Sequence, residues 1–277
     1  MNDHKKGWRK HNIIQPDFEK EHPVYPATRI FDQLCFIGDE NVACFLLETS
    51  EGLVLIDCLF PDEHYRQVVE DGILELGHSM EELTAVMITH GHADHYGAAK
   101  EFREKYGCKL YMSQIDNEFA KKEGTGPFSP IDWDADVYLN DMDEISFGDT
   151  TIKVVFTPGH TPGGLSFIIP VTDAGIYHNL GLWGGTGVGC ADLTAYRNSL
   201  DYFAKICDTY GVDGAISTHP FVDMGIYRLN MIRNIVDGAP NPFIYGIDGF
   251  HYYHNMFYDL CDAEEVRRKS LQLQEEA

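Results

Sequence analysis

Short apolar runs separated by turn residues fill the stretch that follows the first thirty residues of the chain. The runs at 34–37, 42–48 and 53–56 are split by Gly38-Asp39 and by Ser50-Glu51-Gly52. Apolar or alternating runs bounded by such turn residues are typical of antiparallel strands. The pattern therefore predicts a meander of strands at the start of a folded domain.

Helical and strand patterns alternate in the next stretch. Apolar residues recur at helical spacing over residues 63–76, and Gly77 ends this helix. A fully apolar run predicts a buried strand at 84–88. A helix over about 95–106 and a strand at 109–112 complete this group.

Residues 122–143 contain glycine, proline and many aspartates, and they predict a long loop. A loop of this length inside a compact domain is usually functional or mobile. A second group of strands and helices follows it. The strands of this group are predicted at 144–147, 151–156, 165–169, 175–183 and 214–217, and the helices at 193–210, 226–236 and 263–274.

The order of strands and then helices occurs twice, which favours two similar halves. Each half would be a sheet with helices on its outer face. Two such sheets packed face to face form an α/β (α+β) fold of four layers, an αββα sandwich. No linker separates the halves, so residues 29–277 are expected to form a single domain. Residues 1–28 are polar and are predicted to be an N-terminal arm.

Composition and charge narrow the classes of partner. The chain has 277 residues, 44% of them hydrophobic, and a formal net charge of -23. Such a surface repels polyanions, which argues against nucleic acid or an anionic membrane as the partner. No run reaches the ~18 apolar residues of a membrane span, and no signal peptide is visible. We expect a cytoplasmic protein that acts on a small molecule; the oligomeric state is left open.

The seven cysteines are odd in number and include no CxxC pair. Most of them lie in apolar stretches, such as Leu34-Cys35-Phe36. Cysteines in this setting are usually small buried residues of a protein from a reducing compartment. We therefore expect free, buried thiols.

The strongest chemical signal is the segment His90-Gly91-His92-Ala93-Asp94-His95, which directly follows a buried strand. Zinc binds neutral or deprotonated N, O and S donors, usually four of them, and a catalytic site leaves one position for water. Two histidines two residues apart on an extended segment point the same way and can hold one ion together. Asp94 and His95, in the turn, can reach a second ion.

Two more histidines follow apolar strands and can complete such sites. His160 lies in the turn Pro158-Gly159-His160-Thr161-Pro162-Gly163-Gly164, and His219 lies in Thr218-His219-Pro220. Strand ends converge on one edge of a sandwich, where open sheets place their sites. The remaining histidines have the ordinary explanation of surface or core positions; they are His4, His11, His22, His64, His78, His178, His251 and His254.

The motif HxHxDH, the later turn PGHTPGG and a further strand-end histidine together resemble the metallo-β-lactamase superfamily over roughly residues 28–240. The resemblance implies an αββα fold with two Zn²⁺ ions at the edge of the sheets. By position in the motifs, His90, His92 and His160 would hold the first zinc. Asp94, His95 and His219 would hold the second. Asp57 matches a family aspartate near the metals, and we expect it to orient a ligand histidine.

Details within the superfamily separate its branches. Glyoxalase II, many lactonases and many metallo-phosphoesterases carry an extra aspartate that bridges both metals. The corresponding stretch here, 180–187, has no acid at the expected place. Three ligands plus three without a bridge resemble the subclass B3 metallo-β-lactamases. The chain departs from that subclass in lacking a visible leader and a clear serine or lysine for the lactam carboxylate, for which Thr186 is the candidate.

The resemblance implies a hydrolase. Two zinc ions about 3.5–4 Å apart share a hydroxide, because metal binding lowers the pKa of water to about 7. We expect this bridging hydroxide to attack a carbonyl carbon, with a cyclic amide as the first candidate substrate. Asp94 would assist the transfer of the proton, and Asp57 would act from behind the ligands.

Other functions stay open on the same site. One is a lactone, ester or thioester hydrolase, and another is an iron-bound oxidoreductase, because imidazole-rich sites also suit iron. Flavodiiron proteins, however, usually have a glutamate where this chain has His92. A nuclease is disfavoured by the net charge. A scaffold without activity would be expected to lose ligands.

The walls of a cleft are less defined by the sequence. The glycine-rich stretch 184–189 lacks the lysine of a phosphate-binding loop and is expected to lie beside the metals. The aromatic run 243–258 would either cover the cleft or form an interface. Four aromatic residues are candidates for the cleft walls, although core packing is the ordinary role of each; they are Phe128, Trp133, Trp183 and Phe221.

Overall fold

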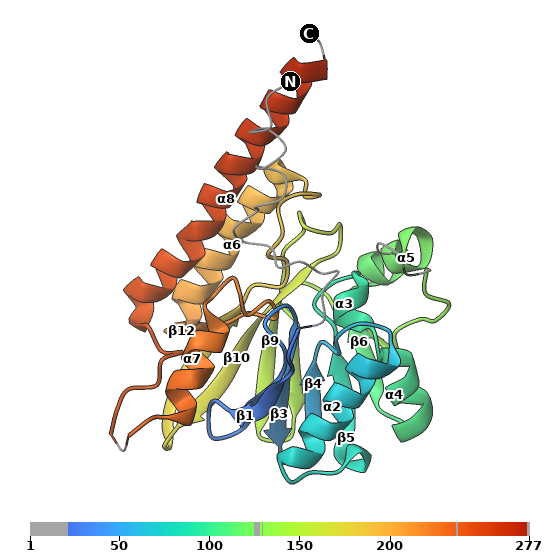
Figure 1. Ribbon diagram of the computed structural model, residues 1–277, viewed down its shortest axis with the longest axis vertical. Helices are drawn as coiled ribbons and strands as arrows, with labels where there is room; N and C mark the ends of the chain where they lie inside the picture. The colour runs from blue at the N-terminus through green and yellow to red at the C-terminus, as the bar shows by residue number, and fades with distance from the viewer. Residues whose placement is uncertain (1–21, 125–127, 129, 237, 276–277) are drawn as a thin grey trace.

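Two sheets lie face to face between two layers of helices in the computed structural model, which describes residues 22–124, 128, 130–236 and 238–275 (Figure 1). One apolar core lies between the sheets, and each sheet shares a further core with the helices on its outer face. This arrangement confirms the predicted four-layer αββα sandwich.

The first sheet has seven strands in sequence order. The strands β1 to β4 pair antiparallel, whereas β4 to β7 pair parallel, so the carboxyl ends of β4, β5 and β6 meet at one edge. That edge carries the motif. The strands are β1 Tyr25–Arg29, β2 Leu34–Gly38, β3 Ala43–Thr49, β4 Gly52–Ile56, β5 Leu83–Met87, β6 Lys109–Met112 and β7 Val137–Tyr138.

The second sheet has five strands in the order β12-β11-β10-β9-β8. All neighbours pair antiparallel except β11 and β12, which are parallel. The strands are β8 Glu144–Phe147, β9 Thr150–Phe156, β10 Leu165–Asp173, β11 Ile176–Leu182 and β12 Gly214–Ile216.

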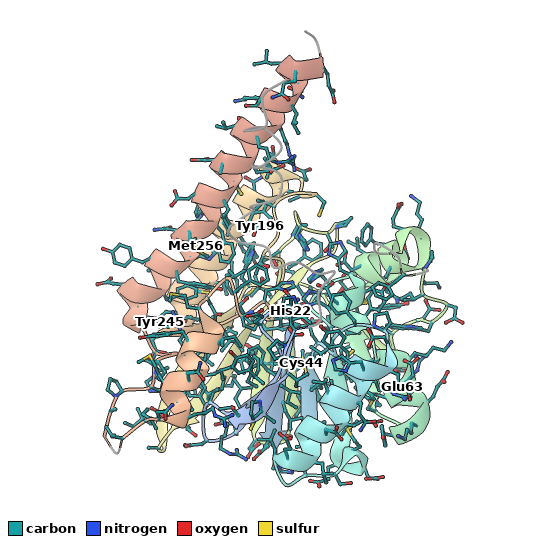
Figure 2. All side chains as sticks on the ribbon, in the orientation of Figure 1. His22, Cys44, Glu63, Tyr196, Tyr245 and Met256 are labelled. Carbon is teal, nitrogen blue, oxygen red and sulfur yellow. The ribbon has the colours of Figure 1, made fainter. Side chains whose placement is uncertain are left out.

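The continuous apolar runs in the sequence follow from burial on both faces of a sheet. In β3, Cys44 and Leu46 pack under the helices, while Ala43, Phe45 and Leu47 pack between the sheets. Because side chains alternate between the two faces of a strand, both sets must be apolar. Figure 2 shows Cys44 at the level of the sheets.

The helices divide between the two outer faces (Figure 1). Helices α2 to α5 accompany the first sheet, and α6 and α8 pack on the second. The helices are α2 Glu63–Glu75, the 3-10 turn η1 Met80–Glu82, α3 Ala93–Tyr96, α4 Ala99–Tyr106, α5 Gln114–Glu123, α6 Leu193–Tyr210, α7 Gly225–Arg233 and α8 Gly246–Glu275.

The helix predicted over 95–106 is broken into α3 and α4. Gly97 lies at the break, and its N–H donates to the carbonyl of Leu59 at 2.8 Å instead of continuing the helix. A Cβ atom at this position would lie 2.1 Å from the carbonyl carbon of Phe60. The break therefore lets the loop after β4 pack directly against the residues of the motif.

Three further elements differ from the sequence-based prediction. The strand β1 begins at Tyr25, inside the range assigned to an arm, whereas residues 1–21 of that arm lie outside the described residues. Strand β7 lies within the predicted loop 122–143, and α5 precedes it. Helix α8 begins at Gly246 rather than near residue 263, because the aromatic residues of its first half pack onto α6 and the second sheet.

All seven cysteines are free thiols, as expected, and six of them are buried; Cys190 is exposed. In the part of the chain that the structure describes, no helix has the length and apolar character needed to cross a membrane.

Candidate metal centre

The side chains of the predicted centre lie just beyond the ends of four strands. Asp57 follows β4, residues 90–95 follow β5, His160 follows β9, and His219 follows β12. Two groups of metal-type ligands form there: His90, His92 and His160, and Asp94, His95 and His219. Within each group the ligand atoms lie within 4.8 Å of one another. The fold thus assembles the same two triads that the resemblance implies.

The two triads are direct neighbours. The ring centroids of His90 and His95, one from each triad, are 3.9 Å apart. Within the first triad, the centroid of His160 lies 4.7 Å from that of His90 and 4.6 Å from that of His92. A pair of ions held by the triads would therefore share one reaction space.

The first triad presents an unpaired ring nitrogen. The Nε2 atom of His90 is buried and has no hydrogen-bond partner among the described residues. Its Nδ1 atom lies 3.0 Å from the hydroxyl of Thr89. The Nδ1 atom of His160 donates to the carbonyl of Gly187 at 2.6 Å, which leaves its Nε2 as an acceptor. A buried acceptor without a donor is costly, and a metal ion removes that cost.

The second triad brings two acceptor nitrogens face to face. His95 donates through Nδ1 to Asp57 at 2.7 Å, and His219 donates through Nδ1 to the carbonyl of Asn41 at 2.7 Å. A neutral imidazole that donates through Nδ1 has a lone pair on Nε2. The two Nε2 atoms are 3.2 Å apart. The Oδ2 atom of Asp94 lies 3.4 Å from Nε2 of His95. Two ring nitrogens this close favour a cation between them, either a proton or a metal ion.

Asp57 holds ligands of both triads. Its Oδ2 atom accepts from His95, and it also accepts from the hydroxyl of Thr89 at 2.8 Å. Because the Thr89 hydroxyl is a donor there, it accepts from Nδ1 of His90. Asp57 itself is fully buried and has a φ of 59°, a conformation that is uncommon for residues other than glycine. One buried carboxylate therefore sets the orientation of His90 and His95.

The three histidines of the first triad are in the protonation state that binds a metal ion. Burial lowers the pKa values of His90 and His160 well below the usual histidine value, and it lowers the pKa of His92 to about 4. All three rings are therefore neutral near pH 7. Neutral imidazole is the form that binds a metal.

The second triad attracts positive charge. Burial opposes a charged His95, but the carboxylates of Asp94 and Asp57 outweigh burial and raise the pKa of His95 to about 10. Near pH 7 this ring therefore binds a proton, which a metal ion would displace. Burial would raise the pKa of Asp94, yet His95 and His219 hold it well below the usual range. Five imidazoles and one carboxylate are donors that fit zinc. The donor set and its orphaned nitrogens thus agree with two ions.

Asp116 is a residue of this region that the sequence analysis missed. It lies on α5, is fully buried, and accepts from the N–H groups of Gly91 at 2.8 Å and Gly163 at 2.6 Å. It also accepts from the hydroxyl of Thr161 at 2.6 Å. Its carboxylate therefore joins the loop of His90 and His92 to the turn that carries His160. A short helix of mixed composition gives no signal for such a role.

The glycine-rich stretch lies against the first triad, as the sequence predicts. A Cβ atom at Gly185 would lie 2.5 Å from Cβ of His160. No carboxylate is shared by the two triads among the described residues. The backbone at Gly185 packs directly against His160, so a side chain at this position would clash with the ligand residue.

The candidate wall residues divide into two pairs. Trp183 and Trp133 are buried at 2% and 7% exposure, and each packs against a tyrosine of the core. Phe221 is partly buried and its ring lies 5.4 Å from that of His219, while Phe128 is partly buried against Phe60 at 5.8 Å. Only the phenylalanines are exposed enough to border a cleft. Thr186, the candidate for binding a substrate carboxylate, is buried at 7% exposure.

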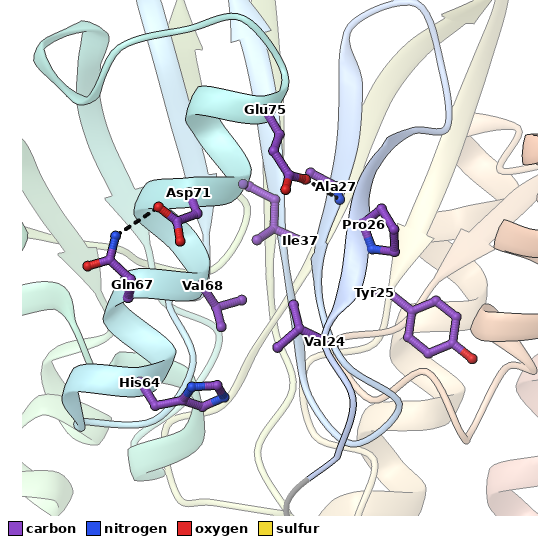
Figure 3. A pocket seen from close by; sticks show the side chains of 11 residues that line it. Val24, Tyr25, Pro26, Ala27, Ile37, His64, Gln67, Val68, Asp71 and Glu75 are labelled. Atoms are coloured by element: carbon purple, nitrogen blue, oxygen red, sulfur yellow. Dashed lines mark hydrogen bonds between the residues drawn. The ribbon is translucent and has the colours of Figure 1, made fainter.

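A separate hollow of about 360 Å³ lies between α2 and β1 (Figure 3). Its lining includes His64, Asp71 and Glu75 but none of the six triad residues. Those three side chains do not form a metal-type group, in the part of the chain that was described. The chemistry of the molecule is therefore concentrated at the triads.

Comparison with known proteins gives a family match and similar folds. The family model described as the metallo-beta-lactamase superfamily matches residues 37–174. A hydroxyacylglutathione hydrolase of Francisella philomiragia is 28% identical over 183 residues, which are 65% of this chain. The chain spans 62% of the length of that curated relative.

Two solved structures show the same fold over nearly the whole chain. BJP-1, a subclass B3 metallo-beta-lactamase of Bradyrhizobium japonicum, has a TM-score of 0.78 at 21% identity and covers 90% of this chain and 96% of its own. The native FEZ-1 metallo-beta-lactamase from Legionella gormanii has a TM-score of 0.75 at 19% identity and covers 89% and 99%.

Proposed function

The chain belongs to the metallo-β-lactamase superfamily, and on that premise we propose that it is a hydrolase that uses two zinc ions to cleave a bond at a carbonyl carbon. The observation that carries the proposal is the pair of adjacent triads, whose closest rings are 3.9 Å apart. Such a pair supplies an activated water and a Lewis acid for the carbonyl oxygen when the ions are bound.

The side chains have distinct tasks in this proposal. His90, His92 and His160 would hold one ion, and Asp94, His95 and His219 would hold the other. Asp57 fixes the rings of His90 and His95 through hydrogen bonds, which keeps their lone pairs directed at the ions. Asp94 is partly exposed, so its second oxygen is able to accept a hydrogen bond from the attacking water and orient it.

We place a cyclic amide first among the substrates. The support is the set of three ligands plus three with no shared carboxylate, a pattern that resembles subclass B3. The partly buried Phe221, whose ring lies beside that of His219, suits an apolar group near the reacting bond. A lactone, whose carbonyl is attacked in the same way, is compatible with this site.

A thioester is the second candidate, and it is favoured by a specific observation. The curated relative that matches 65% of this chain is a hydroxyacylglutathione hydrolase. Against it stands the stretch 180–187, which carries no acid that could bridge the two triads in the way the glyoxalase II pattern does.

A substrate panel tests the proposal. Zinc-loaded protein would be given a chromogenic cephalosporin, a homoserine lactone and an acyl-glutathione thioester, each with and without a chelator. Turnover of the cephalosporin that the chelator abolishes supports the cyclic amide. Thioester turnover alone would replace that substrate class, and no chelator-sensitive turnover of any substrate would contradict hydrolysis at a carbonyl.

A further inference from the structure

The loop 184–192 reaches the first triad and has no regular secondary structure of its own. It contains four glycines, and glycine, which lacks a Cβ atom, leaves the backbone of a loop with unusual conformational freedom. Yet the loop fixes a ligand, because the carbonyl of Gly187 accepts from Nδ1 of His160 at 2.6 Å. A Cβ atom at Gly187 would lie 3.1 Å from the His160 ring. Something must hold this backbone in place against the ring.

The first anchor of the loop comes from α6. The hydroxyl of Tyr196 donates to the carbonyl of Gly185 at 2.7 Å, and the indole N–H of Trp183 lies 2.7 Å from the same oxygen. Figure 2 marks Tyr196 beside the upper part of α6. These contacts fix the start of the loop but not the residues after Gly187.

The second anchor comes from the far part of α8. The Nη2 atom of Arg268 lies 3.1 Å from the carbonyl oxygen of Val188, 3.3 Å from that of Gly189 and 2.9 Å from that of Ala191. Three carbonyl oxygens therefore converge on one guanidinium nitrogen. Hydrogen bonds from a charged donor are roughly twice as strong as those between neutral groups.

Glu264 holds the guanidinium in position. It is 6% exposed and accepts from Nε of Arg268 at 2.8 Å. Burial would raise the pKa of Glu264, but the hydrogen bonds from Arg267 and Arg268 outweigh it and keep this carboxyl ionised. A surface ion pair contributes little to stability, whereas a buried carboxylate such as Glu264 is costly to leave without its partners.

The position of this anchor is unusual for packing alone. Cys261 is the last fully buried apolar residue of α8, and the helix then projects beyond the body of the molecule (Figure 1). Val266 and Leu273 are exposed at 63% and 68%. The contact of Arg268 with the loop is therefore a specific feature of a part of the helix that buries little apolar surface.

From these contacts we propose that Arg268 is a positioning residue for the first metal site, acting through the loop 187–191 and Gly187 on the ring of His160. The inference rests on the proposed function, because it takes His160 as a ligand. In this proposal Arg268 on helix α8 holds the carbonyl groups of the loop in place. The loop in turn accepts from Nδ1 of His160, which directs Nε2 of that ring towards His90 and His92.

The test compares two arginines that share Glu264. Arg267 donates to Glu264 at 2.6 and 2.7 Å, and its side chain is exposed to a similar extent, 43% against 37%. Among the described residues Arg267 forms its hydrogen bonds with Glu264 and none with the loop, so Arg267→Ala is the matched control for Arg268→Ala. Both variants remove one ion pair from the same turn of α8.

The first readout uses the metal-free protein. Hydrogen exchange of the amides of Ala191 and Asp192, which donate to Val188 and Gly159, reports on the loop. We expect exchange at least tenfold faster in Arg268→Ala, with no change in Arg267→Ala. Equal exchange rates in the two variants overturn the proposal, whether or not the protein hydrolyses any substrate.

The second readout is zinc affinity. We expect Arg268→Ala to weaken one of two ions by about 10- to 100-fold, the range found when groups behind metal ligands are removed, and to leave the other unchanged. Arg268→Lys keeps the charge but lacks the planar fork, so it should fall between the variants; it also serves as the test if the alanine variant does not fold. Weakening of both ions, or of neither, contradicts the proposal. If the unmodified chain binds two zinc ions but hydrolyses no substrate, the proposed function alone is rejected.

Discussion

Asp57 connects the two triads through hydrogen bonds that end on one carboxylate oxygen. His95 donates to it directly, while His90 reaches it through the hydroxyl of Thr89. The same carboxylate accepts the N–H of Thr89 at 2.7 Å through its other oxygen. The two branches of this network differ in length, so they are separable by substitution.

Two variants separate the branches. Asp57→Asn removes the charge behind both triads, and we expect both zinc ions to bind about 10- to 100-fold more weakly. Thr89→Val keeps the shape but removes the link to His90, so only one ion should weaken. Competition with a chromophoric chelator measures the two affinities. If Thr89→Val affects both ions equally, the two branches are not independent.

The ligands at this scale were predictable, whereas their supports were not. The six triad residues stand in motifs whose spacing is visible in the sequence, and Asp57 follows an apolar strand. By contrast, His219 is held by the carbonyl of Asn41, and His160 by that of Gly187. A backbone carbonyl is common to every residue, so no side-chain pattern reveals which one accepts.

At the scale of helices and strands, α5 links two ligand-bearing loops through a single side chain. Asp116 accepts from Gly91, Thr161 and Gly163, which belong to the loops after β5 and β9. These loops come from different sheets. The helix therefore fixes how the two sheets present His92 and His160 to one another.

Removing this carboxylate should destabilise the fold. Asp116→Ala leaves two buried N–H groups and one hydroxyl without partners, and each costs about 1–3 kcal/mol, so we expect a loss of at least ~3 kcal/mol in the free energy of unfolding. Glu118→Ala is the control on the same helix, because Glu118 is exposed and, among the described residues, accepts a hydrogen bond only from Gln114. Its effect should stay within ~0.5 kcal/mol. Denaturant titration measures both, and a similar small effect of the two variants would refute the role of Asp116.

Strands and long amphipathic helices were predictable from the sequence, and the irregular elements were not. The helix 193–210 and the strands other than β1 and β7 follow clear hydrophobic patterns. The break at Gly97 depends on the approach of the backbone at Phe60, which is distant from it along the chain. The first half of α8 is rich in aromatic residues, and its helical form depends on packing against Trp183 and Phe203.

The metal pair joins both halves of the sandwich at the scale of the whole molecule. His90, His92 and His95 follow β5 of the first sheet, whereas His160 and His219 follow β9 and β12 of the second. An ion bound by both sheets has affinity for the folded state that an unfolded chain lacks. Metal binding is therefore expected to contribute to stability.

Removal of zinc tests this coupling. A ligand at 100 times its dissociation constant stabilises the native state by about 2.7 kcal/mol, so two saturated sites should lower the unfolding temperature markedly when a chelator strips them. Thermal unfolding followed by circular dichroism, with and without the chelator, gives the shift. His78→Ala, which removes a surface histidine, should show the same shift as the unmodified chain. An unchanged unfolding temperature would indicate that no ion joins the sheets.

The central claim is that two adjacent triads hold two ions, and zinc content per chain tests it most directly. Plasma emission analysis of the zinc-loaded, gel-filtered protein is expected to give two ions per chain. His160→Ala and His219→Ala, one from each triad, should each retain about one. Two ions in both variants would contradict the assignment of the triads, and iron in place of zinc in the protein as isolated would contradict the metal. Fewer than one ion in the unmodified chain would contradict the account as a whole.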